Sequence, residues 1–251
     1  MAPAARPIIA SVSLVILAGG VLLQFLTILS GGVNSSPLDQ FYFLQAATNA
    51  IPNARNPSRW TFFAVCGVDD RGHNADCGKS VPALPFDPPL NFGTTENIPE
   101  PFLGTRHYYY LSRFMFAFYL IALFFAVVAL FTGLLAMCSR LGGYISALTT
   151  ATALFFQTIA AALMTAWVVQ GRDAFRSAGH DSHVGVKLIA FTWTAMACFF
   201  ISTVLFCGGG AIGRESGGIR RKRSTRSSRT AKNRGSFLDN ESQRRAKDNY
   251  S

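Results

Sequence analysis

Four long apolar runs constrain this chain more than any other feature of its sequence. They are Ile8–Leu29, Phe114–Cys138, Tyr144–Val169 and Val186–Cys207. The first holds 22 residues without a charge and would be about 33 Å long as an α-helix, enough to cross a bilayer. A cleaved signal peptide has a shorter apolar core of about 7–15 residues and a small-residue cleavage site, which favours a retained signal-anchor helix here. The sequence therefore predicts four transmembrane helices.

Charge is unevenly distributed, and this predicts the orientation of the spans. Only 14% of the residues are charged, against about 25% in soluble domains. From Arg214 onward the net charge is +8, whereas the first 213 residues carry +2, a balance that does not suit a nucleic-acid-binding domain. Basic residues mark the cytosolic side. The predicted parts are a cytosolic N-terminus (1–7), four spans (8–30, 114–138, 144–169 and 186–207), an extracellular loop domain (31–113), a cytosolic turn (139–143), an extracellular loop (170–185) and a disordered basic cytosolic tail (208–251).

The predicted extracellular loop domain contains two cysteines, Cys66 and Cys77, separated by ten residues rich in turn formers. Outside the cell they are expected to form a disulfide, which would contribute roughly 3 kcal/mol by closing a loop of about 12 residues. Aromatic and β-branched residues favour strands at Phe41–Leu44 and Trp60–Val68. Repeated prolines make Val81–Phe102 an irregular cover without interior strands. The predicted fold class is a four-helix transmembrane bundle with a small, disulfide-stapled, β-rich extracellular domain.

Short motifs give the chain a specific resemblance to a known family. Arg59-Trp60-Thr61, Cys66-Gly67 and Cys77-Gly78 lie in the outer loop, and the aromatic run Tyr108–Phe125 enters the second span. On these motifs the chain resembles the fungal Sur-seven/PalI family, four-span plasma-membrane proteins with a claudin-like layout. The resemblance covers residues 1 to about 210. The loop has no Gly-Leu-Trp triplet, and Trp60 precedes Cys66 by six positions, so the likeness to claudins themselves is one of architecture.

The resemblance also implies a function. Proteins of this family are associated with eisosomes, cortical patches of the fungal plasma membrane, and act in membrane organisation, cell-wall integrity and endocytosis. A PalI-like accessory of an ambient-pH receptor is the alternative, and the sequence does not separate the two. The candidate protein partners are eisosome proteins or further copies of the chain. Arg59, Trp60, Gly67 and Gly78 are the expected structural residues around the disulfide.

Several function classes are disfavoured. The cores of the predicted spans hold no Asp, Glu, Lys, Arg or His, residues on which pumps, ion-coupled transporters and voltage sensors depend. No nucleophile–base pair or phosphate-binding loop is recognisable, so no enzymatic activity and no cofactor is expected. His180 and His183 have a metal-ligand spacing, but a solvated loop is favoured because further ligands are missing nearby. Gln24 and Gln157 are expected to hydrogen-bond between helices.

Basic residues directly after the last span are predicted to bind anionic lipids of the inner leaflet. Each contributes on the order of 1 kcal/mol near an anionic surface, and they are denser than a topology signal requires. Cys138 and Cys207, at the predicted cytosolic ends of spans, are candidates for palmitoylation, with a buried inert thiol as the alternative. The predicted lipid-binding residues are Arg220, Arg221, Lys222, Arg223, Arg226 and Arg229.

Overall fold

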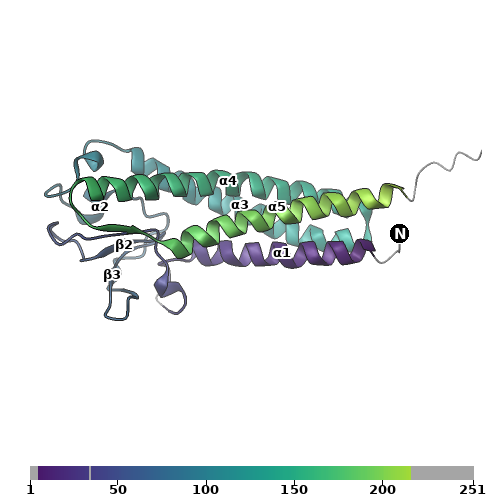
Figure 1. The fold of residues 1–251 in the computed structure, drawn as a ribbon, viewed down its shortest axis with the longest axis horizontal. Coiled ribbons are helices and arrows are strands. Elements are labelled where there is room, and N and C mark those ends of the chain that lie inside the picture. The colour runs from purple at the N-terminus through teal and green to yellow at the C-terminus, as the bar shows by residue number, and fades with distance from the viewer. Residues whose placement is uncertain (1–4, 34, 216–251) are drawn as a thin grey trace, which may run out of the picture. The chain divides into compact units, whose positions relative to one another are not determined.

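The computed structural model describes residues 5–33 and 35–215 of the chain. In it, four long α-helices form a bundle with a small antiparallel sheet at one end (Figure 1). The long helices are α1 (Ala5–Ile28), α3 (His107–Cys138), α4 (Arg140–Ser177) and α5 (Val186–Glu215). The predicted lipid-binding residues Arg220–Arg229 lie outside the described residues.

Each of the four long helices is apolar and long enough to cross a membrane. The apolar segments have mean hydropathies between 1.7 and 2.7, and each overlaps one of the runs predicted from the sequence. The prediction of four such helices is therefore confirmed. The segments are Pro7–Ile28, His107–Met137, Leu141–Ser177 and Val186–Gly209.

Two of the helices are longer than the apolar runs that predict them. α3 begins at His107 rather than Phe114, and α4 continues past Val169 to Ser177. With 38 residues, α4 is about 57 Å long, well beyond the ~30 Å hydrocarbon core of a bilayer. The additional turns pack against the sheet end, where Tyr108 of α3 lies 5.7 Å from Phe86, measured between ring centres. These helix ends therefore pack together with the sheet.

The connection between α3 and α4 is shorter than the predicted turn 139–143. Only Ser139 has an extended backbone, and its hydroxyl accepts a hydrogen bond from the N–H of Gly142 at 2.9 Å. This N-cap satisfies one of the free donors at the start of α4, so the helix begins at once. Gly142 allows the close approach of the two helices, since a Cβ there would lie 2.6 Å from the backbone of Leu135.

We expect Gly142→Ala to destabilise the bundle by about 1–3 kcal/mol, because the new methyl group forces α3 and α4 apart. Gly19→Ala is the matched control: that position lies inside α1, where a Cβ would meet nothing within 4 Å. Since alanine favours a helix over glycine, the control should leave stability unchanged or raise it. Thermal unfolding midpoints of the purified variants in detergent measure both effects, and equal midpoints for the two would contradict the account.

A polar cluster in the middle of the bundle joins all four long helices. Gln24 of α1 donates its Nε2–H to the side-chain oxygen of Gln157 on α4 at 2.9 Å and to the carbonyl of Tyr119 on α3 at 3.0 Å. Gln157 donates to the carbonyl of Thr192 on α5 at 3.2 Å. The Tyr119 and Thr192 hydroxyls are 2.6 Å apart. The expected hydrogen bonding of both glutamines between helices is confirmed.

The sheet has five strands in the spatial order β4-β3-β2-β1-β5, and all neighbours are antiparallel. β5 comes from the link between α4 and α5 and pairs with β1, with His183 opposite Gln45. The loop predicted at 170–185 is thus partly helix and partly an edge strand. The strands are β1 (Leu44–Ala46), β2 (Ser58–Trp60), β3 (Val65–Val68), β4 (Asn74–Ala75) and β5 (Ser182–Val184).

The two strands predicted from the sequence differ from those observed. The first, predicted at Phe41–Leu44, lies at Leu44–Ala46. The second, predicted as one strand over Trp60–Val68, is a hairpin, because the Thr61 hydroxyl binds both the N–H and the carbonyl of Ala64 and closes a turn. The apolar turn faces the helix ends, where Phe62 packs against Phe116 of α3 with ring centres 5.1 Å apart.

The proline-rich segment Val81–Phe102 covers the helix-facing side of the sheet. It contains the short helix α2 (Pro88–Phe92) and the 3-10 turn η2 (Glu100–Phe102) and otherwise loop, so the prediction that it holds no interior strand is confirmed. A further 3-10 turn, η1 (Leu38–Gln40), precedes β1. Three buried rings of the cover, Phe86, Phe92 and Phe102, complete the core between the sheet and the helix ends.

Candidate functional site

The side chains of the adjacent residues Arg59 and Trp60 of β2 lie on opposite faces of the sheet, because successive side chains alternate along a strand. Trp60 stands opposite Leu44 and Val65 in a row on the face that meets the helices. Arg59 stands opposite Gln45 and Cys66 on the other face. One short strand therefore joins the sheet to the helices on one side and to the disulfide-bearing hairpin on the other.

Trp60 lies at the centre of the core between the sheet and the helix ends. Its side chain is 2% exposed, and its ring lies 5.3 to 5.8 Å from those of Phe86, Phe92 and Phe175. The indole N–H donates to the side-chain oxygen of Asn91 on α2 at 2.9 Å, so the polar atom is satisfied although it is buried. Because Phe175 belongs to the extension of α4, this cluster fixes the sheet to the bundle.

Arg59 organises the opposite face of the sheet. Its guanidinium donates to Gln45 on β1 at 2.8 Å and, through Nη1, to the Gly72 carbonyl at 2.8 Å and to Asn74 on β4 at 3.2 Å. It also lies over the ring of Tyr42, 4.2 Å from its centre. Burial lowers the pKa of the Arg59 guanidinium, an effect opposed by Tyr42 and the charge of Asp69. Arg59 thus carries a largely buried positive charge.

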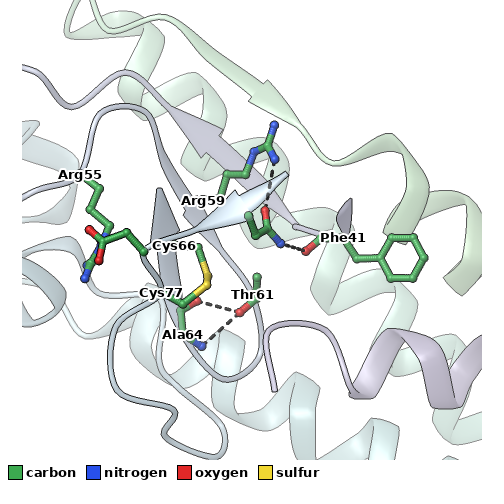
Figure 2. The surroundings of a disulfide bond; sticks show 9 residues. Phe41, Arg55, Arg59, Thr61, Ala64, Cys66 and Cys77 are labelled. Atoms are coloured by element: carbon green, nitrogen blue, oxygen red, sulfur yellow. Dashed lines mark hydrogen bonds and ion pairs between the residues drawn. A yellow bond between two sulfur atoms is a disulfide. The ribbon is translucent and has the colours of Figure 1, made fainter. Parts of the chain in front are cut away.

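The predicted disulfide between Cys66 and Cys77 is present (Figure 2). It joins the fully buried Cys66 of β3 to the residue two positions after the end of β4. An ion pair of 3.0 Å between Arg55 and Asp76 lies beside it. β4 consists of only two residues, so the covalent link holds a hairpin whose ladder alone is short.

Three glycines lie in the backbone at the sheet end of the bundle, and two of them, Gly67 and Gly78, belong to the motif. Gly31, with φ +75°, brings the end of α1 against the hydroxyl of Thr61, at a distance that leaves no room for a Cβ. Gly67 lies in β3, where a Cβ would meet the Ala75 carbonyl at an ordinary contact distance of 3.4 Å. The N–H of Gly78 donates to the carbonyl of Val65 at 2.9 Å. Steric room requires glycine at position 31, whereas the structural role of Gly67 and Gly78 stays a prediction.

The turn between β3 and β4 is held by one carboxylate. Asp69 accepts backbone hydrogen bonds from His73 at 2.7 Å and Arg71 at 3.0 Å. Chiefly because of the His73 N–H, the pKa of Asp69 is lowered from its ordinary value. The stabilising contribution of this group is thus fully present above its unfolded-state pKa and is lost as the pH falls through the lower folded-state value.

A cavity of about 370 Å³ lies on the Arg59 face, and sequence analysis did not find it. Three cationic residues line it: Arg59, Arg71 from the β3–β4 turn, and Lys187 at the start of α5. The first and last of these cations, Arg59 and Lys187, are 128 positions apart in the sequence, so no local pattern could reveal the site. The remaining lining residues are Gln40, Tyr42, Gly72, His73, Gly185 and Val186.

Of the other residues singled out from the sequence, the cysteines Cys138 and Cys207 lie apart from this face, whereas His183 stands opposite Gln45 on it. Cys138 ends α3, and Cys207 is an exposed free thiol near the end of α5, both at the end of the bundle away from the sheet. His183 pairs with Asp181 at 3.2 Å, and His180 packs against Phe175. Among residues 5–33 and 35–215, no three His, Cys, Asp or Glu side chains cluster as metal ligands.

Comparison with known proteins places these features in a family context. The pattern that defines the SUR7/PalI family matches residues 9–205. Protein SUR7 of Candida albicans is 41% identical over 199 residues, which cover 78% of this chain and 72% of that protein. SUR7 family protein FMP45 of Saccharomyces cerevisiae is 40% identical over 191 residues, 75% of this chain and 62% of that protein.

A further similar protein is the uncharacterized plasma membrane protein YNL194C of Saccharomyces cerevisiae. It is 34% identical over 197 residues, which cover 77% of this chain and 65% of that protein. The chain therefore spans between 62% and 72% of the length of these three curated relatives. None of the three names describes an enzyme.

Proposed function

The chain belongs to the SUR7/PalI family, and on that premise we propose that it is a structural protein of the plasma membrane that organises eisosome-associated domains. The observation that carries the proposal is the extent of the family match, since residues 9–205 include the four long helices almost entirely and the whole sheet. The relative named as a plasma membrane protein supports the location. Roles in cell-wall integrity and endocytosis follow as consequences of such organisation.

The proposed orientation places the sheet outside the cell and both termini in the cytosol. A disulfide persists in an oxidising compartment, which supports an extracellular position for Cys66 and Cys77. Four crossings return the chain to the side on which it began. On this side the basic tail would meet the anionic inner leaflet, which favours lipid contact by Arg220–Arg223 with Arg226 and Arg229. Palmitoylation of Cys138 and Cys207 would act at the same surface.

A fluorescent fusion in living fungal cells tests this function. We expect static cortical patches that coincide with eisosomes, because a structural component stays with its domain. Replacing the six basic tail residues by glutamine should spread the signal evenly over the plasma membrane, since the electrostatic contact is lost. A wild-type fusion that is uniform over the surface, or confined to internal membranes, would contradict the proposal.

A deletion strain distinguishes domain organisation from the alternative, PalI-like role. Deletion of an accessory of an ambient-pH receptor should abolish the response to alkaline medium, whereas deletion of a domain organiser should leave it intact. Loss of alkaline signalling together with a uniform distribution would favour the PalI-like function over domain organisation.

A further inference from the structure

The cavity beside Arg59 has the composition of an anion site. Its lining includes three cations, Arg59, Arg71 and Lys187, and no carboxylate. Two carboxylates lie beside it: Asp39 pairs with His73 at 3.1 Å, and Asp69, which accepts two backbone N–H groups of its own turn, keeps its charge and attracts Arg59 and Arg71. The three cations of the lining therefore exceed the negative charge that Asp69 sets against them.

Arg59 is the most informative of these cations. It is 7% exposed, and its hydrogen-bond partners are an amide, a carbonyl and a second amide, all uncharged. A buried charge is normally paired with an opposite one, because removing it from water is costly. In the part of the chain that the structure describes, no carboxylate forms a salt bridge with Arg59, and Asp69 acts on its charge without direct contact, so an anion in the cavity would supply the missing close partner.

The other two cations are available for a ligand. The guanidinium of Arg71 makes no hydrogen bond within the described ranges, and Arg71 is exposed at the mouth of the cavity. Among residues 5–33 and 35–215, the ammonium of Lys187 hydrogen-bonds only to the neutral side chain of Gln40. Val186 and Lys187 are the first residues of α5, and the N-terminus of a long helix also favours negative charge nearby.

The position of the cavity indicates which kind of anion would bind there. Lys187 is the second residue of the apolar segment Val186–Gly209, so the cavity lies where α5 would leave the bilayer at its sheet end. That is the level of lipid headgroups. The guanidinium of Arg71, the ammonium of Lys187 and the remaining Nη2 group of Arg59 match the several acceptor oxygens of a phosphate group better than a single carboxylate.

The geometry points to a binding site for a phosphate group between β1, β2, the β3–β4 turn and the start of α5, filled by a phospholipid headgroup or by soluble phosphate. The site is built from residues that the proposed membrane-organising role does not use. Its test employs purified protein, so its failure and the failure of that role are distinguishable.

The test measures phosphate binding to full-length protein in lipid nanodiscs. One arm titrates inorganic phosphate into discs of phosphatidylcholine. The other uses native mass spectrometry to compare lipid retained from an equimolar mixture of phosphatidylcholine and phosphatidic acid. We expect Arg71→Gln combined with Lys187→Gln to weaken binding about tenfold or more, because two charge-assisted contacts are removed. Lys79→Gln, which removes an exposed cation of the same domain away from the cavity, is the matched control.

The two arms identify the source of the phosphate. Selective retention of phosphatidic acid, reduced in the double variant and kept in the control, supports a headgroup site. Binding of inorganic phosphate with no lipid preference supports a soluble ligand. Absence of both, or binding equally affected by Lys79→Gln, would overturn the proposal. Arg71→Lys keeps the charge but loses the planar donor pair, so it should bind more tightly than Arg71→Gln and more weakly than the wild type, an order that a merely structural effect would not predict.

Discussion

Trp60→Ala is expected to lower the free energy of unfolding by about 3–5 kcal/mol, the largest effect of any single substitution considered. The indole is almost fully buried among three phenylalanines from two parts of the chain, the proline-rich cover and the extension of α4. Its removal leaves a cavity at the junction of sheet and bundle and deprives the Asn91 oxygen of its indole donor. The sheet and its proline-rich cover should therefore detach from the helix ends before the bundle itself unfolds.

Trp193→Ala provides the matched control for this substitution. Trp193 is 41% exposed on α5 and contacts Thr165 at 3.3 Å, so truncation there creates no enclosed cavity. Purified variants are heated in detergent, and the folded fraction is measured by size-exclusion chromatography. The unfolding midpoint should fall strongly for Trp60→Ala and slightly for Trp193→Ala. Comparable unfolding midpoints for both variants would show that Trp60 does not stabilise the contact between the sheet and the helix bundle.

Removing the disulfide is expected to cost about 3 kcal/mol, because the loop it closes becomes free in the unfolded chain. In the folded protein the effect concentrates on β4, whose two residues provide little pairing of their own. Asn74 on β4 also accepts a hydrogen bond from Arg59 and donates one to the Phe41 carbonyl, so release of β4 would loosen the whole Arg59 face.

The double variant Cys66→Ser with Cys77→Ser measures this contribution. We expect a lower unfolding midpoint and reduced delivery to the cell surface, since a small domain has little core to spare. Cys207→Ser, which changes an exposed free thiol on α5, serves as the control for stability and should keep the wild-type unfolding midpoint. A double variant with the unfolding midpoint of this control and the surface level of the wild type would show that the bridge is dispensable.

The helices and the disulfide were predictable because their signals are local and physically unambiguous. An uncharged run such as Ile8–Leu29 can satisfy its backbone in a membrane only as a helix, so its length and composition determine the element. The extensions of α3 and α4 were not predictable in this way. The extensions are less apolar than the spans, and contacts with the sheet end stabilise them as helix. They comprise His107–Arg113 and Gln170–Ser177.

The sheet was harder to predict because its strands are short and its turns are unusual. The hairpin between Trp60 and Val65 has phenylalanines in its turn, which composition favours as a strand, and only the contact with α3 explains them. β5 pairs with a strand more than 130 residues earlier, a long-range contact that no local pattern announces. The cavity beside Arg59 depends on the same long-range pairing, since it brings Lys187 to the β3–β4 turn.

The most direct test of the account is the redox state of the cysteines in the cell, because the stapled sheet is claimed to face the oxidising side. Cells are quenched in acid, treated with a membrane-permeant alkylating reagent, and the protein from the plasma-membrane fraction is mapped by mass spectrometry without reduction. The account predicts that Cys66 and Cys77 are recovered as one linked pair, whereas Cys207 in the same molecules is alkylated or acylated. Recovery of Cys66 and Cys77 as separate alkylated peptides would contradict it.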